Sequence, residues 1–303
     1  MSDEFLSICI PTRNRSHLLR DLLRSIAEQI DAGGLTPTDV RVYVFDNAST
    51  DATAQVMAEA AGGRSHFTYS CNLRNIGAMY NVLLCCRSGN GRYRWLIGDD
   101  EWLAPGALSA LLSHLREQNP GWFVHWDGSR YFTPLGLPHT YPDVAAFVQH
   151  ASRVDPESLM AAGAISLNTF RSDCFDHAYA DSLKDTSTYA HWYGLMNGLK
   201  KCGASVHFTG QRTVVVREQR PAPSDNELPA DSDANWRGCL TWLRNEFHLP
   251  DLNPDVFSRL VSEEWMRQLR RHPWRTFRNN IAVLRIPSAW PRIFRRLWYL
   301  VKR

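Results

Sequence analysis

The length, composition and charge of the sequence exclude several classes of protein. Its 303 residues, 44% hydrophobic and 21% charged, suffice for one large α/β domain and are unlike a disordered chain. The formal net charge is only +3, and no run approaches the roughly 20 apolar residues that cross a bilayer. Seven cysteines without a CxxC pair argue against a disulfide framework or a zinc ribbon. The first residues lack the basic and apolar segments of a secretory signal, so we expect a cytoplasmic protein.

The first half of the chain is predicted to alternate strands and helices. Short apolar runs predict buried strands over 5–10, 40–45, 66–70, 94–97 and 122–126. Apolar residues at helical spacing predict helices over 16–26, 52–61, 77–87 and 105–115. Ser16 is expected to cap the first helix, and Pro105 to open the fourth. The alternation predicts an α/β fold with a mostly parallel sheet, covered by helices on both faces.

The second half of the chain has a weaker pattern after Gly128. We expect strands over 164–170, 205–209 and 213–217, and helices over 188–201, 234–247 and 254–271. The polar, Pro-rich segment 218–233 predicts a loop.

Polar segments follow four of the predicted strands at the point where each strand ends. They are PTRN at 11–14, DNASTD at 46–51, NLRN at 72–75 and GDDE at 98–101. Ligands of open parallel sheets bind beyond the carboxyl ends of the strands, so we expect these segments to meet on one rim. Neither GxGxxG nor GxxxxGK[ST] follows a strand, which argues against Rossmann dehydrogenases and P-loop enzymes.

The rim contains carboxylates that could bind a metal ion and a nucleotide. Asp99, Asp100 and Glu101 are consecutive, and adjacent carboxylates repel one another unless they are solvated, protonated or bound to a cation. Mg²⁺ and Mn²⁺ bind through one or two carboxylates together with substrate phosphates. The alternative is a solvated acidic turn before the helix at Pro105. Asp46 could accept a hydrogen bond from a uracil imide or a ribose hydroxyl, or could shape its loop as an Asx-turn.

Four longer segments contain these residues, and together they are more informative than any one of them alone. In chain order they are LSICIPTRNRSHLLRDLLRSI, VYVFDNASTDAT, NLRNIGAMYN and RWLIGDDEWLAPGAL, which lie within residues 5–125. Together they resemble the family 2 glycosyltransferases with the GT-A fold, in particular the bacterial branch that builds O-antigen and other surface polysaccharides. The resemblance implies a metal-dependent, inverting transfer of a sugar from a nucleotide-diphosphate donor to a hydroxyl of a glycan or lipid-linked acceptor.

The resemblance also implies a domain organisation and roles for single residues. Residues 1–128 form the donor-binding half of a GT-A domain, 129–233 the acceptor-binding half, and 234–303 a helical extension. The residues implied in donor binding are Pro11, Thr12, Arg13, Asp46, Arg74, Asn75, Asn81 and Asp99. A divalent metal, Mn²⁺ or Mg²⁺, would be held by Asp100 together with Asp99.

The catalytic base is the residue for which this sequence departs from the family. Inversion requires a base that takes the proton of the acceptor hydroxyl. The family usually has a Glu-Asp pair before a helix in the second half, and LKDTSTYAHWYGLMNGL has no such pair. His191 is closest to the expected position, and Asp185 is the nearest carboxylate, so both are candidates.

The end of the chain differs in charge from the rest. Residues 265–303 hold eleven of the 34 Lys and Arg and no acid, so the preceding 264 residues have 23 basic and 31 acidic side chains, a balance of −8. Four tryptophans are interleaved with these basic residues. Basic and aromatic residues together suit an anionic membrane surface, so we expect peripheral binding at the inner face of the plasma membrane. The alternatives are pairing with acids of the main domain and binding of nucleic acid, which the acidic remainder argues against.

Two other functions are open at this point. A nucleotidyltransferase would carry a Gly-rich, Lys-containing loop after the first strand, where this sequence reads PTRNRSH. A nucleotide-sugar-binding module without catalysis is compatible with the missing Glu-Asp pair.

Overall fold

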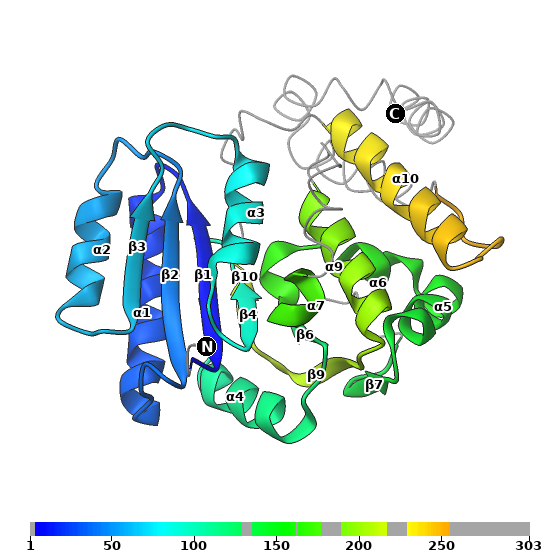
Figure 1. The fold of residues 1–303 in the computed structure, drawn as a ribbon, viewed down its shortest axis with the longest axis horizontal. Helices are drawn as coiled ribbons and strands as arrows, with labels where there is room; N and C mark the ends of the chain where they lie inside the picture. Colours follow the sequence, from blue (N-terminus) through cyan, green and yellow to red (C-terminus); the bar gives the residue numbers. More distant parts are fainter. Residues whose placement is uncertain (1–3, 129–134, 162, 177–188, 217–228, 255–303) are drawn as a thin grey trace, which may run out of the picture. The chain divides into compact units, whose positions relative to one another are not determined.

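The computed structural model describes residues 4–128, 135–161, 163–176, 189–216 and 229–254 (Figure 1). The chain divides into two compact units, Met1–Glu218 and Gln219–Arg303.

A sheet of eight strands, in the order β3-β2-β1-β4-β8-β6-β9-β7, forms the centre of the first unit. Its strands are β1 (Leu6–Thr12), β2 (Val40–Asp46), β3 (Phe67–Cys71), β4 (Tyr93–Leu96), β6 (Trp122–Trp126), β7 (His139–Tyr141), β8 (Asn168–Arg171) and β9 (Val206–Arg212). The strands β1 to β4 run parallel, as do β6 and β9. In contrast, β8 is antiparallel to β4 and β6, and β7 is antiparallel to β9. The predicted α/β fold with a mostly parallel sheet is confirmed.

The helices that the structure describes in the first unit pack around this sheet. They are α1 (Ser16–Gly33), α2 (Thr53–Ala61), α3 (Ala78–Ser88), α4 (Ala107–Gln118), α5 (Val144–Val154), α6 (Pro156–Ala161), α7 (Ser172–Asp176) and α9 (Ala190–Cys202). Helix α1 contacts α2 and α4, whereas α3 contacts α7 and α9. Figure 1 shows α1 behind β2 and β3, and α3 beside β1.

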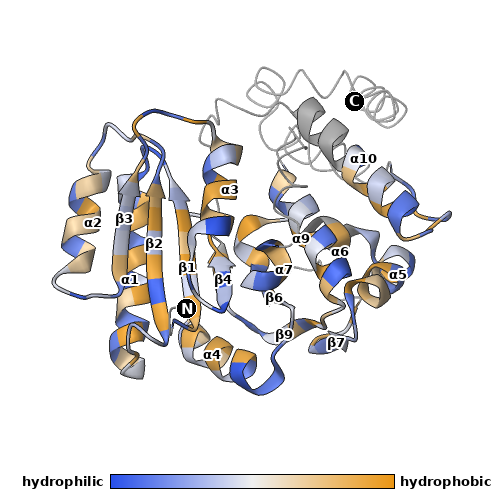
Figure 2. Ribbon diagram, in the orientation of Figure 1, coloured by the Kyte–Doolittle hydropathy of each residue, from blue (hydrophilic) through white to orange (hydrophobic). Residues whose placement is uncertain are grey.

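The core lies between the central strands and the apolar side of α1. Nearly every residue of β1 and β2 is buried, as expected of parallel strands covered on both faces, and Figure 2 shows the hydrophobic residues along β2. Helix α1 buries residues at the spacing of an amphipathic helix, namely Leu19, Leu22, Leu23, Ile26 and Ile30. It ends at Gly34, whose φ of 57° lies in the left-handed region that glycine adopts without a steric penalty.

Several predicted boundaries are wrong. Ser16 is the first residue of α1 and not its N-cap, which is Arg15. The segment that begins at the third acidic residue forms a short strand, β5 (Glu101–Leu103), antiparallel to β10 (Val214–Val216). The strand β7 and the helices α5, α6 and α7 lie where no such element was predicted. The end of the predicted loop 218–233 is helical, because α10 (Pro229–Glu246) begins at Pro229.

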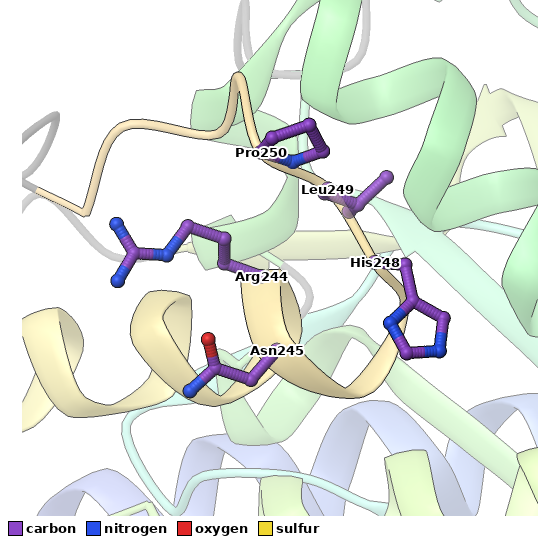
Figure 3. A pocket seen from close by; sticks show the side chains of 5 residues that line it. All are labelled: Arg244, Asn245, His248, Leu249 and Pro250. Atoms are coloured by element: carbon purple, nitrogen blue, oxygen red, sulfur yellow. The ribbon is translucent and has the colours of Figure 1, made fainter.

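The second unit is described from α10 to residue 254. Cys239, Leu240 and Leu243 are buried, and a hollow of about 500 Å³ lies at the end of this helix. Figure 3 shows the side chains that line it, which are Arg244, Asn245, His248, Leu249 and Pro250. None of the described helices combines the length and the apolar character that crossing a bilayer requires. The predicted helix 254–271 and the basic segment 265–303 lie almost wholly outside the described residues.

Candidate functional site

The carboxyl ends of β1, β2 and β3 lie side by side at one edge of the sheet. Thr12 is in register with Asp46, and Asp46 with Cys71. The arrowheads of these strands mark this edge in Figure 1. The N–H of Asn47 donates to the Thr12 carbonyl at 2.9 Å, and the N–H of Asn72 donates to the Asp46 carbonyl at 2.8 Å. The polar segments therefore meet on one rim, as the alternation of strands and helices predicted.

The loops after β1 and β2 are bound to each other. The N–H of Asn14 donates to Oγ of Ser49 at 2.8 Å. Asp51 accepts from the N–H of Ser16 at 2.9 Å and from the N–H of Thr53 at 3.1 Å, so one carboxylate satisfies the first turns of α1 and α2. Partial burial would raise the pKa of Asp51, but hydrogen bonds from Thr53 and Ser16 lower it to about 2.

Asp46 is buried beneath this rim and shapes the loop that follows it. Its Oδ1 accepts from the N–H of Ser49 at 2.9 Å, as in an Asx-turn, and its Oδ2 accepts from the hydroxyl of Tyr69 at 2.6 Å. Burial, followed by the hydrogen bond to Asp46, raises the pKa of Tyr69. Oδ1 also accepts from the hydroxyl of Ser49 at 2.5 Å, so the lone pair that remains for a nucleotide base is on Oδ2. The base-binding role of Asp46 stays a prediction.

A network of side-chain amides attaches the segment 72–77 to the end of β2. Nδ2 of Asn47 donates to Asn75 at 2.8 Å, and Nδ2 of Asn72 donates to Asn47 at 3.2 Å and to Asn81 at 3.0 Å. Asn81 is buried, whereas Asn75 and Arg74 are exposed. Of these predicted donor-binding residues, Asn75 and Asn81 take part in the amide network, and Arg74 is exposed beside it in the sequence.

Asp99 and Asp100 follow β4 and share one positively charged partner. Oδ2 of Asp99, which is only 4% exposed, accepts from the hydroxyl of Thr12 at 2.6 Å. A single nitrogen of Arg15, Nη1, lies 3.0 Å from Oδ1 of Asp99 and 3.3 Å from Oδ2 of Asp100. Burial raises the pKa of Asp99, while the hydrogen bond from Thr12 and the charge of Arg15 act against this shift. The structure thus brings Thr12, Asp99 and Asp100 together.

Arg15 is the member of this group that the sequence did not predict. PTRNR places two arginines after β1, and no periodicity tells which of them turns toward the acids. The predicted residue Arg13 is exposed, and Pro11 lies half-buried in β1. The position of Arg15 directly before α1 is a signal that could have pointed to it.

Gly98 allows the turn that carries the two aspartates. Its N–H donates to Oγ of Ser166 at 2.8 Å. A Cβ on Gly98 would lie 3.0 Å from Oδ1 of Asp100, which is closer than such atoms normally approach. The missing side chain therefore lets Asp100 fold back toward the end of β4.

Glu101, the third acid, is not equivalent to the other two. Its Oε2 is buried and has no hydrogen-bond partner among the described residues. Burial, together with the negative charges of Asp100 and Asp127, raises the pKa of Glu101 to about 8, although a hydrogen bond from Ser166 acts to lower it. Glu101 therefore carries a proton at neutral pH. Of these three acids, Asp99 and Asp100 are the ones whose oxygens converge on one cationic atom, Nη1 of Arg15. Carboxylate oxygens in such an arrangement could also bind Mg²⁺ or Mn²⁺, which prefer hard oxygen ligands.

His191, one of the two predicted bases, lies inside the fold on α9. Its Nε2 donates to the Gly163 carbonyl at 3.0 Å, which leaves the lone pair on Nδ1. Nδ1 is buried without a hydrogen-bond partner in the described part of the chain. Burial lowers the pKa of His191 to about 4, so it is neutral at pH 7 but a weak base. Asp185, the other candidate, lies outside the described residues.

The comparison with known families agrees with this arrangement of the rim. The model of the Glycosyl transferase family 2 matches residues 7–161, slightly more than half of the chain. The chain belongs to this family. The match extends over β1 to β6 and all four polar segments, and the suspected relationship to family 2 is confirmed.

One relative is similar over part of the sequence, and solved structures are similar in fold. Abequosyltransferase RfbV of Salmonella typhimurium is 36% identical over 115 residues, which are 37% of this chain and 33% of that protein, so the match spans about a third of the relative. TarS 1–349 of S. aureus in complex with UDP-GlcNAc has a TM-score of 0.55 and 17% identity, covering 90% of this chain and 75% of that one. Mannosyltransferase PcManGT from Pyrobaculum calidifontis, in complex with GDP-Man and Mn²⁺, has a TM-score of 0.57 and 15% identity, covering 93% and 85%. At such identities the likeness concerns the fold, and it confirms the predicted GT-A type.

Proposed function

We propose that this family 2 protein transfers a sugar from a nucleotide-diphosphate donor to a hydroxyl of a glycan or lipid-linked acceptor in bacterial surface polysaccharide synthesis. The observation that carries the proposal is the convergence of Asp99 and Asp100 on one cationic atom at the carboxyl edge of the sheet. The printed names of the relatives support it, because RfbV is an abequosyltransferase and two of the similar structures hold UDP-GlcNAc or GDP-Man.

The donor would lie on residues 1–128, over the ends of β1 to β4. The loops after β1, β2 and β3 are joined by hydrogen bonds of 2.8–2.9 Å, which would hold the rim in place for the donor. Arg74 is exposed on the segment 72–77, where it could contact the donor. Asp99 and Asp100 would hold Mn²⁺ or Mg²⁺. Such an ion neutralises the charge that builds on the departing diphosphate.

The chemical step would be a single displacement with inversion. The oxygen of the acceptor hydroxyl attacks the anomeric carbon, and the bond from that carbon to the diphosphate oxygen breaks. The proton of the hydroxyl passes to a base, for which Nδ1 of His191 and the carboxylate of Asp185 are the candidates. Residues 129–233 would bind the acceptor, since His191 and Asp185 both belong to this part of the chain.

The test of this function is a transfer assay with purified protein. UDP-, GDP- and dTDP-sugars are offered with Mn²⁺ and a lipid extract from a bacterium that makes surface polysaccharide, and release of the nucleoside diphosphate is measured. We expect sustained release from one class of donor, lost in Asp100→Asn and retained in Glu59→Gln, a matched exposed acid on α2. Tight nucleotide binding without any release would instead favour a non-catalytic sugar-nucleotide-binding module.

A further inference from the structure

We propose that Arg15 is an internal counter-cation of the donor site, which neutralises Asp99 and Asp100 until a divalent metal ion displaces it toward the donor diphosphate. The inference rests on the proposed function and adds a residue and a role to it. Arg15 would then act twice, first in place of the metal ion and later as a ligand of the donor.

The contacts of the guanidinium support the first role. Nη1 alone bridges Oδ1 of Asp99 and Oδ2 of Asp100, at 3.0 and 3.3 Å, so it occupies the point at which the two carboxylates converge. Asp99 is buried and its neighbour Asp100 nearly so, and two such charges require a positive partner. The part of the chain that the structure describes gives Arg15 no other ion-pair partner. A metal ion on the same oxygens would have to replace Nη1, because both positive charges cannot occupy one position.

The backbone around Arg15 is held by hydrogen bonds, whereas its side chain is partly exposed to solvent. The N–H groups of Asn14 and Ser16 are both bound to the loop after β2, through Ser49 and Asp51. The side chain of Arg15 itself is 38% exposed. Exchange of partners would therefore require rotation of one side chain and no movement of the loop.

The second role, as a ligand of the donor diphosphate, follows from displacement of the Arg15 guanidinium by the metal ion. A guanidinium separated from its carboxylates needs another anion, and the diphosphate bound to the same metal ion would be within reach of its flexible side chain. Arginine suits this role because its planar group binds phosphate oxygens with two parallel hydrogen bonds.

An alternative is that Arg15 only orients the two carboxylates for the metal ion. The two roles predict opposite effects of its removal on metal binding. If Arg15 competes with the metal ion, its loss strengthens metal binding, whereas if it orients the ligands, its loss weakens metal binding. Asp99 would keep its hydrogen bond from Thr12 in either case, so the carboxylate does not depend on Arg15 alone.

The experiment measures two affinities in one set of variants. Binding of Mn²⁺ to the free protein is followed by electron paramagnetic resonance, and binding of UDP, GDP and dTDP at saturating Mn²⁺ by calorimetry. The variants are Arg15→Gln, Arg15→Lys and Arg20→Gln. Arg20 is the matched control, since it lies on α1 and pairs with Glu59 at 3.1 Å, away from the rim. Circular dichroism and thermal melting check that each variant is folded.

We expect opposite shifts in Arg15→Gln. The Kd for Mn²⁺ should fall about threefold or more, because a competing positive charge is lost. The Kd for the nucleoside diphosphate should rise about tenfold, the change that corresponds to one charge-assisted hydrogen bond. Arg15→Lys keeps the charge and should bind Mn²⁺ within about threefold of the wild type. Arg20→Gln should change neither affinity.

The outcomes separate this inference from the proposed function. An unchanged or raised Kd for Mn²⁺ in Arg15→Gln, with normal binding by the wild type, would overturn the inference alone. A wild type that binds neither Mn²⁺ nor any of the nucleotides would overturn the proposed function and the inference with it. Should Arg15→Gln fail to fold, an Arg15→Lys protein that binds Mn²⁺ at least tenfold more weakly than the wild type would overturn the inference.

Discussion

The hydroxyl of Thr12, the last residue of β1, donates a 2.6 Å hydrogen bond to Oδ2 of Asp99, which follows the neighbouring strand β4. Both side chains are buried, and 87 positions separate them in the sequence. A buried carboxylate must be hydrogen-bonded or lose its charge. The contact therefore links the position of Asp99 to the register of two parallel strands, so the sheet itself places this carboxylate on the rim.

Removal of this hydroxyl should lower stability. We expect Thr12→Val to reduce the free energy of unfolding at pH 7 by about 1–3 kcal/mol, because Oδ2 of Asp99 loses a donor that water cannot readily replace. Thr12→Ser keeps the hydroxyl and should lose less than about 1 kcal/mol. Urea unfolding measures both. Equal stability of Thr12→Val and the wild type would show that the contact is dispensable.

The loop after β2 contains a residue in an unfavourable backbone conformation. Ala48 has a φ of 59°, in the left-handed region that favours glycine. We expect Ala48→Gly to change the free energy of unfolding by less than about 1 kcal/mol, since relief of strain offsets the added entropy of the unfolded chain. Ala48→Val should lower it by about 1–2 kcal/mol, because β-branched residues tolerate this region poorly. The two variants are compared by urea unfolding, and a valine variant as stable as the glycine variant would contradict the assignment.

Buried histidines should make the fold sensitive to mild acid. Burial lowers the pKa of His191 to about 4, and burial together with the charge of His114 lowers that of His207 to about 4. The unfolded chain then binds more protons than the native protein between pH 6.5 and 4, so stability is complete above this window and falls as the pH decreases through it. From pH 7.5 to 5.0 each such histidine should cost at most about 2 kcal/mol.

The measurement is urea unfolding at these two pH values, in the wild type and in two variants. His207→Gln should reduce the loss of stability, whereas His17→Gln, at an exposed position on α1, should not change it. A stability that does not depend on pH over this range would show that the buried rings are protonated without cost.

The basic segment 265–303 gives a prediction about membranes. If its arginines and tryptophans contact anionic headgroups, a chain that ends at residue 272 should lose binding to phosphatidylglycerol liposomes in a flotation assay. The same chain should bind nucleoside diphosphates as the full chain does, because the rim lies within residues 1–128. Undiminished flotation of the shortened chain would refute the membrane role of this segment.

The first half of the fold could be predicted because its signals are local. The buried runs of β1 and β2 and the spacing of leucines in α1 follow from residues that are close in sequence. The parallel direction of these strands follows from their alternation with helices. The rim was predictable for the same reason, since its polar segments end successive parallel strands.

Other features could not be predicted, because tertiary contacts decide them. The strand β5 is three residues long and forms by pairing with β10, more than 100 positions away. Arg15, and not Arg13, contacts Asp99 and Asp100, which lie more than 80 positions away in the sequence. His191 is buried by segments that are distant in the sequence, such as the one that contains Gly163. In contrast, α5 was predictable, because Val144, Phe147, Val148 and Ala151 have helical spacing behind the capping residue Asp143.

In the proposed function, Asp99 and Asp100 would hold a divalent ion that binds a nucleoside diphosphate. The most direct measurement is calorimetric titration of the wild type and Asp100→Asn with UDP, GDP and dTDP, with and without Mn²⁺. We predict that one nucleotide binds the wild type at least tenfold more tightly with Mn²⁺, and that Asp100→Asn removes this dependence on the metal. Binding that is equally tight without Mn²⁺, or that Asp100→Asn leaves unchanged, would contradict it.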